Sequence, residues 1–415
     1  RDFVAAIDRD FGHRSSHETR LAELYIVTAA ARHALANVRR WMRPRRIATP
    51  IHLLPGSARI VPQPLGVAGV VSPWNYPVQL ALAPAIGALA AGNRVMLKPS
   101  EVTPATSALL AEAIAQRFAP DEFTVVIGDA ETGAEFTRLP FDHLFFTGST
   151  AVGRIVAMAA AENLTPVTLE LGGKSPAIVD ASADLAVVAP RIAVGKLLNA
   201  GQTCIAPDYV LIPRGSESAF ADAYKAAVAK LFPTIAGNDD YASIISPRHL
   251  ARLRSMLQQA QTQGAQVLSM DPAQGQSVAP GAATLDGATS RQMAPVLVMG
   301  ATSAMQVMQE EIFGPVLAVT TFKDEAEALA IANDTLYGLG AGVWSRNGNV
   351  AYRMGRAIKA GRVWTNCYHA YPAHAAFGGY KESGIGRETH KMMLDHYQQT
   401  KNLLVSYSEN KLGFF

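Results

Sequence analysis

The chain has few of the residues that build cross-linked, metal-bound or membrane-spanning proteins. It contains two cysteines, Cys204 and Cys367, without CxxC spacing, so a disulfide framework and a cysteine-rich zinc site are disfavoured and a reducing, cytoplasmic location is expected. Its ten histidines form no HxH or HExxH pairing, so no metal site is expected. No apolar run is long enough to span a bilayer and no secretion leader is evident, which disfavours membrane insertion and export.

Charge is also sparse. Only 17% of the residues are charged, the net charge is +3, and the basic residues cluster just once, in RRWMRPRR at 39–46. This cluster could contact phosphate, but a solvated helix end is the commoner use of such a run. No basic stripe with interleaved aromatic residues is present, so nucleic acid is not an expected partner.

Apolar residues are abundant, at 49% of a chain of 415 residues, and this length predicts two or more domains. Strand-like and helix-like runs alternate, which predicts an α/β protein with a mostly parallel, doubly wound sheet covered by helices. The first strands are expected at 67–72, 94–100, 123–128 and 143–149, with helices at 78–92, 103–118 and 151–163. A second α/β region follows from about residue 173, with a helix at 186–199 and strands at 295–300, 316–322 and 362–366.

The remaining segments give simpler patterns. Residues 17–41 have the spacing of an amphipathic helix, and residues 46–64 predict a hairpin around Pro55-Gly56-Ser57. Residues 272–290 are rich in small residues and proline, which indicates a surface loop. Residues 402–408 predict a strand with no partner nearby in the sequence.

A cysteine and a carboxylate are the first candidates for chemistry. Cys204 lies in GKLLNAGQTCIAPDY; a lone cysteine is usually a small buried apolar group, and to react it needs a cationic neighbour or a helix N-terminus. Glu170 lies in LTPVTLELGGKSP at a strand end, where partial burial would make it a base near neutral pH. The alternative is a buried acid paired with Lys174. Cys367 is interpreted as a packing residue.

Two strand ends carry groups suited to a dinucleotide. Gly148 and Gly153 flank the start of a helix, whose free N–H groups can bind pyrophosphate. The full GxGxxG pattern is absent, so a plain strand–helix turn is the alternative. In KPSE (98–101), Lys98 and Glu101 supply the donor and the acceptor that a ribose diol needs, although the tetrapeptide alone is ordinary loop sequence.

Two further motifs complete the candidate site. In SPWNYP (72–77), Asn75 can donate its amide to a developing oxyanion, or it can simply satisfy a turn. In EEIFGP (310–315), Glu311 can accept ribose hydroxyls and Phe313 offers an apolar face to a nicotinamide ring. Together these residues predict a cysteine-bound acyl intermediate, a carboxylate that activates water and a dinucleotide that accepts electrons.

The motifs SPWNYP, KPSE, FTGSTAVG, ELGGKSP, GQTC, EEIFGP and FGGYKESGIGRE, in this order, resemble the aldehyde dehydrogenase superfamily over nearly the whole chain. The resemblance implies a Rossmann-like NAD-binding domain (1–45 and 65–172), an α/β catalytic domain (173–382) and a β-flap oligomerisation element (46–64 and 398–415). It also implies a homodimer or homotetramer, and a C-terminal strand that pairs with the hairpin.

The resemblance assigns roles to the candidate residues. Cys204 would attack the aldehyde to give a thiohemiacetal, Asn75 and the Cys204 N–H would hold its oxyanion, and Glu170 would activate the water that releases the acid from the thioester. Glu101 would favour NAD over NADP, although many relatives accept both. The implied cofactor contacts are Ser72, Trp74, Lys98, Ser100, Glu101, Gly148, Ser149, Val152, Gly153, Leu171, Glu311 and Phe313.

Within this superfamily the chain combines two branches. Up to about residue 310 it resembles coniferyl-aldehyde dehydrogenases, and beyond about residue 312 it resembles bacterial acetaldehyde and short-aliphatic dehydrogenases. A chimera with its junction near EEIFGP and an unusual natural branch are alternative explanations. The aldehyde substrate is expected to be aromatic first and short aliphatic second, in a pocket lined by Tyr76, Leu80 and Ile205 from the first part and Tyr368, His369 and Phe377 from the second.

Two other functions compete with this interpretation. In a CoA-acylating semialdehyde dehydrogenase, CoA rather than water resolves the thioester, and Glu170 argues against this because that reaction needs no base for water. A catalytically silent structural or binding protein is the other alternative. The joint presence of Cys204, Glu170 and Asn75 argues against it.

Overall fold

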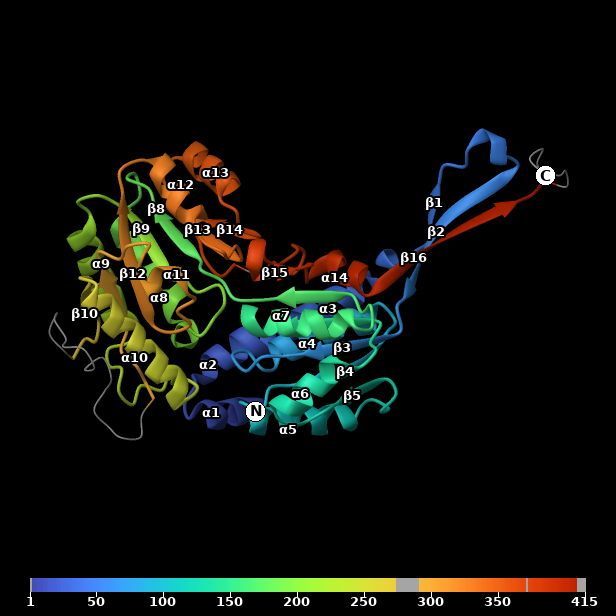
Figure 1. Ribbon diagram of the computed structural model, residues 1–415, viewed down its shortest axis with the longest axis horizontal. Helices are drawn as coiled ribbons and strands as arrows, with labels where there is room; N and C mark the ends of the chain where they lie inside the picture. The colour runs from blue at the N-terminus through green and yellow to red at the C-terminus, as the bar shows by residue number, and fades with distance from the viewer. Residues whose placement is uncertain (1, 274–290, 371, 409–415) are drawn as a thin grey trace.

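The computed structural model describes residues 2–273, 291–370 and 372–408. It contains a six-stranded sheet, a seven-stranded sheet and a three-stranded sheet. The first two form separate helix-covered lobes, and the third projects from the body as an arm (Figure 1). The predicted α/β class is confirmed. Among the described residues, no helix is long and apolar enough to cross a membrane.

The six-stranded sheet has the order β15-β7-β6-β3-β4-β5 and is parallel except at β15. Its strands are β3 (Val67–Val71), β4 (Arg94–Lys98), β5 (Phe123–Val125), β6 (His143–Thr147), β7 (Val167–Glu170) and β15 (Gly384–Ile385). The helices between them are α4 (Gln79–Ala90), α5 (Pro104–Ala115), α6 (Ala130–Thr137) and α7 (Thr150–Ala161). The predicted strand and helix alternation is therefore confirmed, with each strand ending one to three residues early.

Strand β6 shows why helices cover both faces of this sheet. Because side chains alternate along a strand, Phe145 points into one core and its neighbours Leu144 and Phe146 point into another. The first core receives helices α4 and α5, and the second receives α6 and α7. Burial on both faces explains the continuous apolar runs from which the strands were predicted.

The seven-stranded sheet has the order β10-β11-β12-β9-β8-β13-β14 and is parallel except at β10. Its strands are β8 (Pro176–Val179), β9 (Tyr209–Pro213), β10 (Gln266–Ser269), β11 (Val296–Met299), β12 (Val316–Phe322), β13 (Gly340–Trp344) and β14 (Arg362–Thr365). The helices around it are α8 (Leu185–Leu197), α9 (Glu217–Leu231), α10 (Pro247–Thr262), α11 (Gln306–Gln309), α12 (Glu325–Asn333) and α13 (Gly348–Ala357). Of the expected loop 272–290, residues 274–290 lie outside the described part.

The arm joins distant parts of the sequence. It consists of β1 (Arg45–Ile47), the 3₁₀ turn η2 (Ile51–Leu53), β2 (Gly56–Pro64) and β16 (Gln398–Ser406). β2 pairs antiparallel with both β1 and β16, so the C-terminal strand has its partner more than 300 residues away. The hairpin predicted at 46–64 is confirmed as the antiparallel pair β1 and β2, but its turn lies earlier than Pro55-Gly56-Ser57, because β2 already starts at Gly56 and the chain reverses through the 3₁₀ turn before it.

The N-terminal helices pack onto the first lobe and also reach the second. They are α1 (Asp2–Phe11), α2 (Ser16–Glu18), η1 (Thr19–Tyr25) and α3 (Ile26–Trp41). The helix predicted at 17–41 is therefore continuous but wound as a π-helix over Thr19–Tyr25. Near the C-terminus, η4 (Lys381–Ser383) and α14 (His390–His396) lead into β16.

Candidate active site

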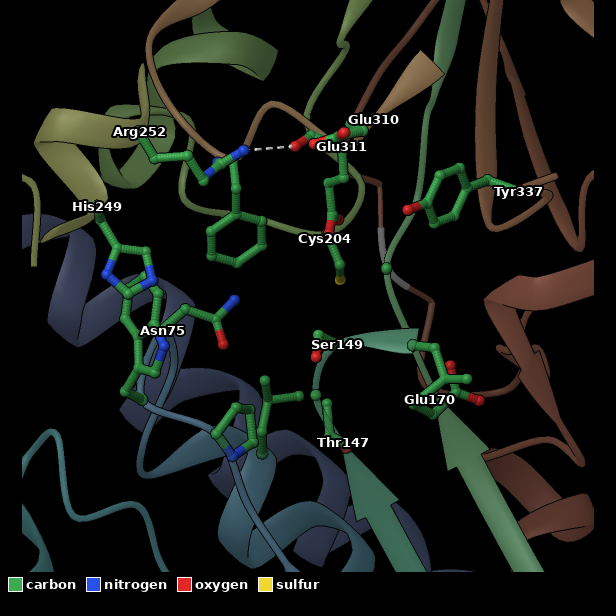
Figure 2. Close-up of a pocket in the computed structure, with 17 residues that line it drawn as sticks. Asn75, Thr147, Ser149, Glu170, Cys204, His249, Arg252, Glu310, Glu311 and Tyr337 are labelled. Carbon is green, nitrogen blue, oxygen red and sulfur yellow. Dashed lines mark hydrogen bonds between the residues drawn. The ribbon is translucent and has the colours of Figure 1, made fainter. Parts of the chain in front are cut away.

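A cavity of about 390 Å³ lies where the two lobes meet, and it contains the three predicted catalytic side chains (Figure 2). Strands β3, β6 and β7 of the first lobe deliver their carboxyl ends to it, which is where open parallel sheets bind ligands. The second lobe contributes Cys204, the first turns of α10 and the segment 310–313. The lining residues predicted from the sequence are Trp74, Asn75, Leu80, Gly148, Ser149, Glu170, Leu171, Cys204, Glu311 and Phe313.

Cys204 is presented by an unusual turn. Helix α8 ends at Leu197 and is followed by Asn199, Ala200 and Gly201 with φ of 53°, 51° and 76°. Left-handed φ values strain residues other than glycine and are typical of functional sites. The turn leaves the thiol of Cys204 partly exposed in the cavity.

The electrostatic surroundings of Cys204 differ from the expectation. Burial raises the pKa of the thiol, and the nearby carboxylates of Glu311, Glu170 and Glu388 raise it further. Of the two sources of thiolate character considered, a cationic neighbour or a helix N-terminus, no cation of the described residues is among the causes of this shift. The protein alone therefore favours the neutral thiol.

Asn75 points into the cavity close to Cys204 (Figure 2). Its Nδ2 donates to the carbonyl oxygen of Gln202 at 3.2 Å, and its own carbonyl oxygen accepts from Asn199 Nδ2 at 3.0 Å. These bonds connect the loop after β3 with the turn before Cys204. The amide is thus held beside the thiol, where an oxyanion would form.

Glu170 ends β7 and is buried, with 4% exposure. One carboxylate oxygen lies next to Gly378, and Figure 2 shows the carboxylate turned away from Cys204. Neither oxygen has a hydrogen-bond partner among the described residues. Burial raises the pKa of Glu170 well above its usual value, and Glu388 raises it further while Arg387 opposes the shift. The alternative pairing with Lys174 is wrong, because Lys174 pairs with Asp208 at 3.2 Å.

Glu388 is a functional candidate that the sequence did not single out. It lies within the quoted motif FGGYKESGIGRE, but nothing in the pattern shows that this end of the motif faces Glu170. Burial raises the pKa of Glu388 to about 7, opposed by Arg362. Two buried acids therefore influence each other's protonation beside the cavity.

A larger cleft of about 860 Å³ continues from the cavity along the six-stranded sheet. The predicted cofactor contacts Ser72, Trp74, Lys98, Ser100, Glu101, Gly148, Ser149 and Val152 line it. Ser72 Oγ and Thr147 Oγ1 are buried without a hydrogen-bond partner among the described residues, and both lie along this surface. Unsatisfied hydroxyls beside a helix N-terminus fit a polar, anionic ligand such as a dinucleotide.

Gly153 has a packing role rather than a lining one. It lies in the first turns of α7, and a Cβ at this position would meet Leu171 Cδ2 at 2.5 Å. The missing side chain lets α7 approach the segment after β7 closely. Ser149 caps this helix by accepting from the Val152 N–H at 3.4 Å.

The EEIFGP segment supplies a carboxylate and a ring. Glu311 Oε1 accepts from the Gly173 N–H at 2.8 Å, so part of its hydrogen-bonding capacity is already used. Burial raises the pKa of Glu311 to about 8, and the Gly173 bond opposes this. Phe313 has φ of 55° and packs edge-on against Trp74, with ring centroids 5.4 Å apart.

The predicted substrate residues divide into two groups. Leu80 lines the cavity, whereas Tyr76, Ile205, Tyr368, His369 and Phe377 are not among its lining residues. Ile205, Tyr368 and Phe377 instead form an apolar cluster that packs against Cys204. Tyr76 bonds to Thr203 Oγ1 at 2.7 Å, and His369 bonds to the Gly195 carbonyl at 2.8 Å.

Helix α10 contributes His249 and Arg252, which no sequence motif marked. Arg252 donates to the carbonyl oxygen of Glu311 at 3.1 Å and also to that of Ile312, as Figure 2 shows for the first bond. It therefore holds the backbone of EEIFGP against the cavity. Glu310 and Tyr337 complete this wall.

The other cysteine, Cys367, lies outside the cavity. Cys367 is exposed, so its interpretation as a packing residue is wrong: it follows edge strand β14, where no core covers it. Within the described parts of the chain, no cluster of three or more histidine, cysteine, aspartate or glutamate side chains could hold a metal ion.

Comparison with known proteins agrees with this geometry. Residues 14–403 match the aldehyde dehydrogenase family. The chain is 43% identical over 390 residues to the coniferyl aldehyde dehydrogenase of Pseudomonas sp. strain HR199, covering 93% of this chain and 79% of the relative. It is 49% identical over 368 residues to acetaldehyde dehydrogenase 2 of Cupriavidus necator, covering 85% of this chain and 70% of the relative.

A solved structure gives the same result. The fold superposes with a TM-score of 0.88 on the NAD⁺ complex of an aldehyde dehydrogenase from Mycobacterium tuberculosis, at 31% identity, covering 99% of this chain and 82% of that one. The chain therefore belongs to the aldehyde dehydrogenase family and is an NAD(P)-dependent enzyme that oxidises aldehydes.

Proposed function

We propose that Cys204 is the nucleophile, Asn75 the oxyanion donor and Glu170 the base in the oxidation of an aldehyde to its carboxylic acid. The observation that carries this proposal is the single cavity in which the three side chains meet. Cys204 gives its proton to water and, as the thiolate, bonds to the aldehyde carbon, whose carbonyl oxygen becomes the oxyanion. Asn75 Nδ2 and the Cys204 N–H stabilise the oxyanion.

Bound NAD supplies the hydride acceptor and, through its positively charged ring, a charge that favours the thiolate. Loss of hydride leaves a thioester on Cys204. Glu170 then swings from its position beside Gly378 and takes a proton from water, which attacks the thioester and releases the acid. Its raised pKa suits this role, because a base with an ordinary carboxylate pKa would be too weak near neutral pH.

The cofactor site follows from the cleft. Lys98 and Glu101 would bind the adenosine ribose, the α7 N-terminus the pyrophosphate, and Glu311 with Phe313 the nicotinamide ribose and ring. Glu101 opposes a 2′-phosphate by charge repulsion, which favours NAD over NADP. The Rossmann-like part would comprise 1–45 and 65–172, and the catalytic part 173–382.

We assign an aromatic aldehyde as the first substrate class and a short aliphatic aldehyde as the second. Relatives named for both classes match most of the chain at similar identity. Ile205 and Phe377 come from the two parts of the chain and pack in one apolar cluster against Cys204, outside the lining of the cavity, so both parts shape the surroundings of the thiol. The intact mass of the protein and its gene sequence would decide whether the chain is a chimera joined near residue 312 or a natural branch of the family.

The arm supports assembly into a homodimer or homotetramer. Strand β16 is an edge strand of nine residues, and Leu403, Leu404 and Val405 on it are 38–48% exposed. A long, apolar edge strand is a template for pairing with another chain. Light scattering of the purified protein distinguishes the two assemblies from a monomer.

The first experiment is NADH formation with coniferyl aldehyde, benzaldehyde and acetaldehyde, each with NAD and with NADP. Turnover with one of them supports the proposal, and the ranking identifies the substrate class. A folded protein that binds NAD but oxidises none of the three would contradict it.

A further inference from the structure

A buried ionic cluster, formed by the N-terminal helices and the loop between α1 and α2, contacts the loop that carries Asn75 and the turn that precedes Cys204. Arg14 and Glu23 form an ion pair of 3.1 Å, and both side chains have no exposed surface. Glu18 lies beside them and is 9% exposed. None of the three lines the cavity. Since burying charge is costly and an apolar pair often serves stability better, the cluster calls for another explanation.

One branch of the cluster holds the Asn75 loop. Arg14 donates to the carbonyl oxygen of Asn75 at 3.0 Å. Glu23 Oε2 accepts from the N–H groups of Val78 and Gln79, at 2.9 and 2.7 Å, where helix α4 begins. The ion pair therefore holds the backbone of this loop at Asn75 and at its junction with α4.

The other branch holds the turn before Cys204. The Glu18 carboxylate accepts from the Asn199 N–H at 3.1 and 3.2 Å. This bond lies at the first of the three left-handed residues that present Cys204. Asn199 Nδ2 then donates to the carbonyl oxygens of Asn75 and Gln202, at 3.0 and 3.2 Å, and so connects the two loops.

The guanidinium of Arg14 also supports a third contact. It lies over the rings of Phe11 and Tyr76, at 4.9 and 4.7 Å. The Tyr76 hydroxyl bonds to Thr203 Oγ1 at 2.7 Å, one residue before Cys204. Arg14 thus contacts the carbonyl of Asn75 and the ring of its neighbour, whose hydroxyl reaches the cysteine loop.

We infer that Arg14, Glu18 and Glu23 are positioning residues: through their hydrogen bonds they fix the position of the Asn75 amide relative to the Cys204 thiol. This inference rests on the proposed function, because it matters only if Asn75 stabilises an oxyanion formed on Cys204. A displacement of about 1 Å at such a site can cost about 100-fold in rate. The competing explanation is a cluster that serves folding stability alone.

Two variants separate these explanations. Arg14→Met leaves the Glu23 carboxylate buried without its cation, so the melting temperature should fall sharply. Adding Glu23→Gln removes that unpaired charge and should restore much of the melting temperature. The bond to Asn75 remains lost, so kcat of the double variant should stay about tenfold or more below wild type, with KM for NAD within about twofold.

Recovery of kcat together with the melting temperature would overturn the inference. If the double variant fails to fold, Arg14→Lys keeps a cation opposite Glu23 but lacks the planar guanidinium, whose Nη1 reaches both Glu23 and Asn75 while the group lies over the rings of Phe11 and Tyr76. It should fold and show the same loss of kcat. Wild-type kcat in Arg14→Lys would equally overturn the inference.

Asp10→Ala is the matched control, since Asp10 lies in helix α1 and, among the residues that the structure describes, accepts hydrogen bonds only from Ala105 and Thr106, at 2.7–2.9 Å. It should lower the melting temperature and leave kcat unchanged; an equal loss of kcat would show that the rate merely follows stability.

Asn75→Ala, measured alongside, tests the underlying proposal. Its kcat should fall by about 100-fold or more. Wild-type kcat here would refute the role of Asn75 itself, whereas a loss in Asn75→Ala with normal Arg14 variants would refute only the positioning role.

Discussion

The two walls of the cavity differ in how firmly they hold their reactive groups. On the Cys204 wall, Gln202 donates its amide to the Asn199 and Ser243 carbonyls at 3.0 and 2.9 Å and accepts from the Ile245 N–H at 2.8 Å. On the opposite wall, the Glu170 carboxylate makes no hydrogen bond to any described residue.

This difference matches the roles proposed for the two walls: nucleophile and oxyanion donor on the Cys204 wall, and base on the Glu170 wall. A nucleophile and its oxyanion donor react faster when their geometry is fixed, because the entropy of orienting them is lost during folding, before the substrate binds. A base that acts on a later step must leave room for the substrate and then approach water. The unbonded carboxylate beside Gly378 meets that need.

The largest effect is expected from removing the proposed nucleophile, Cys204. Cys204→Ala should lower aldehyde oxidation by at least about 10³-fold, because no thioester can form. NAD binding, followed by fluorescence titration, should stay nearly intact. Cys367→Ala is the control and should retain wild-type turnover. Turnover of Cys204→Ala at the wild-type rate would remove the covalent mechanism.

Replacing the proposed base should have a smaller and qualitatively different effect. Glu170→Gln leaves acylation possible but slows attack by water, so one NADH per active site should form in a burst. The following steady state should lie about 10²- to 10³-fold below wild type. Rapid-mixing absorbance of NADH measures both phases. Steady turnover at the normal rate would mean that another group activates water.

Removing the hydrogen bonds of Gln202 beside Cys204 should lower both the stability of the protein and kcat. Gln202→Leu leaves buried partners on Asn199, Ser243 and Ile245 unpaired, a loss of about 3 kcal/mol. Urea unfolding should show the lower midpoint and kcat should fall about tenfold. Gln263→Leu, at an exposed helix end, should change neither. Normal kcat in a destabilised Gln202→Leu would show that the wall need not be rigid.

The smallest effect is a shift in pH dependence. Glu388 raises the pKa of Glu170, so Glu388→Gln should lower that pKa. With Glu170 as the proposed ionised base, the rising limb of kcat against pH should move to lower pH. Glu325→Gln, at the surface pair with Arg353, should leave the limb unmoved. A shift to higher pH would contradict the coupling of the two acids.

Local pattern predicted much of the fold because buried parallel strands and their helices leave continuous apolar signatures, as at 143–147. It also located Cys204, Glu170 and Asn75, which lie in motifs at strand ends and turns. It could not locate His249 or Glu388, because helical spacing and a glycine-rich loop do not show which lobe they will face. Arg14 and Glu23 were missed for the same reason: they act through partners far along the chain.

The most direct test is the intact mass of Glu170→Gln protein after reaction with benzaldehyde and NAD, followed by peptide mapping. The account predicts one added benzoyl group per chain, on the peptide containing Cys204 and not on the exposed Cys367. An unmodified protein that has nevertheless produced NADH, or an acyl group on a different residue, would contradict it.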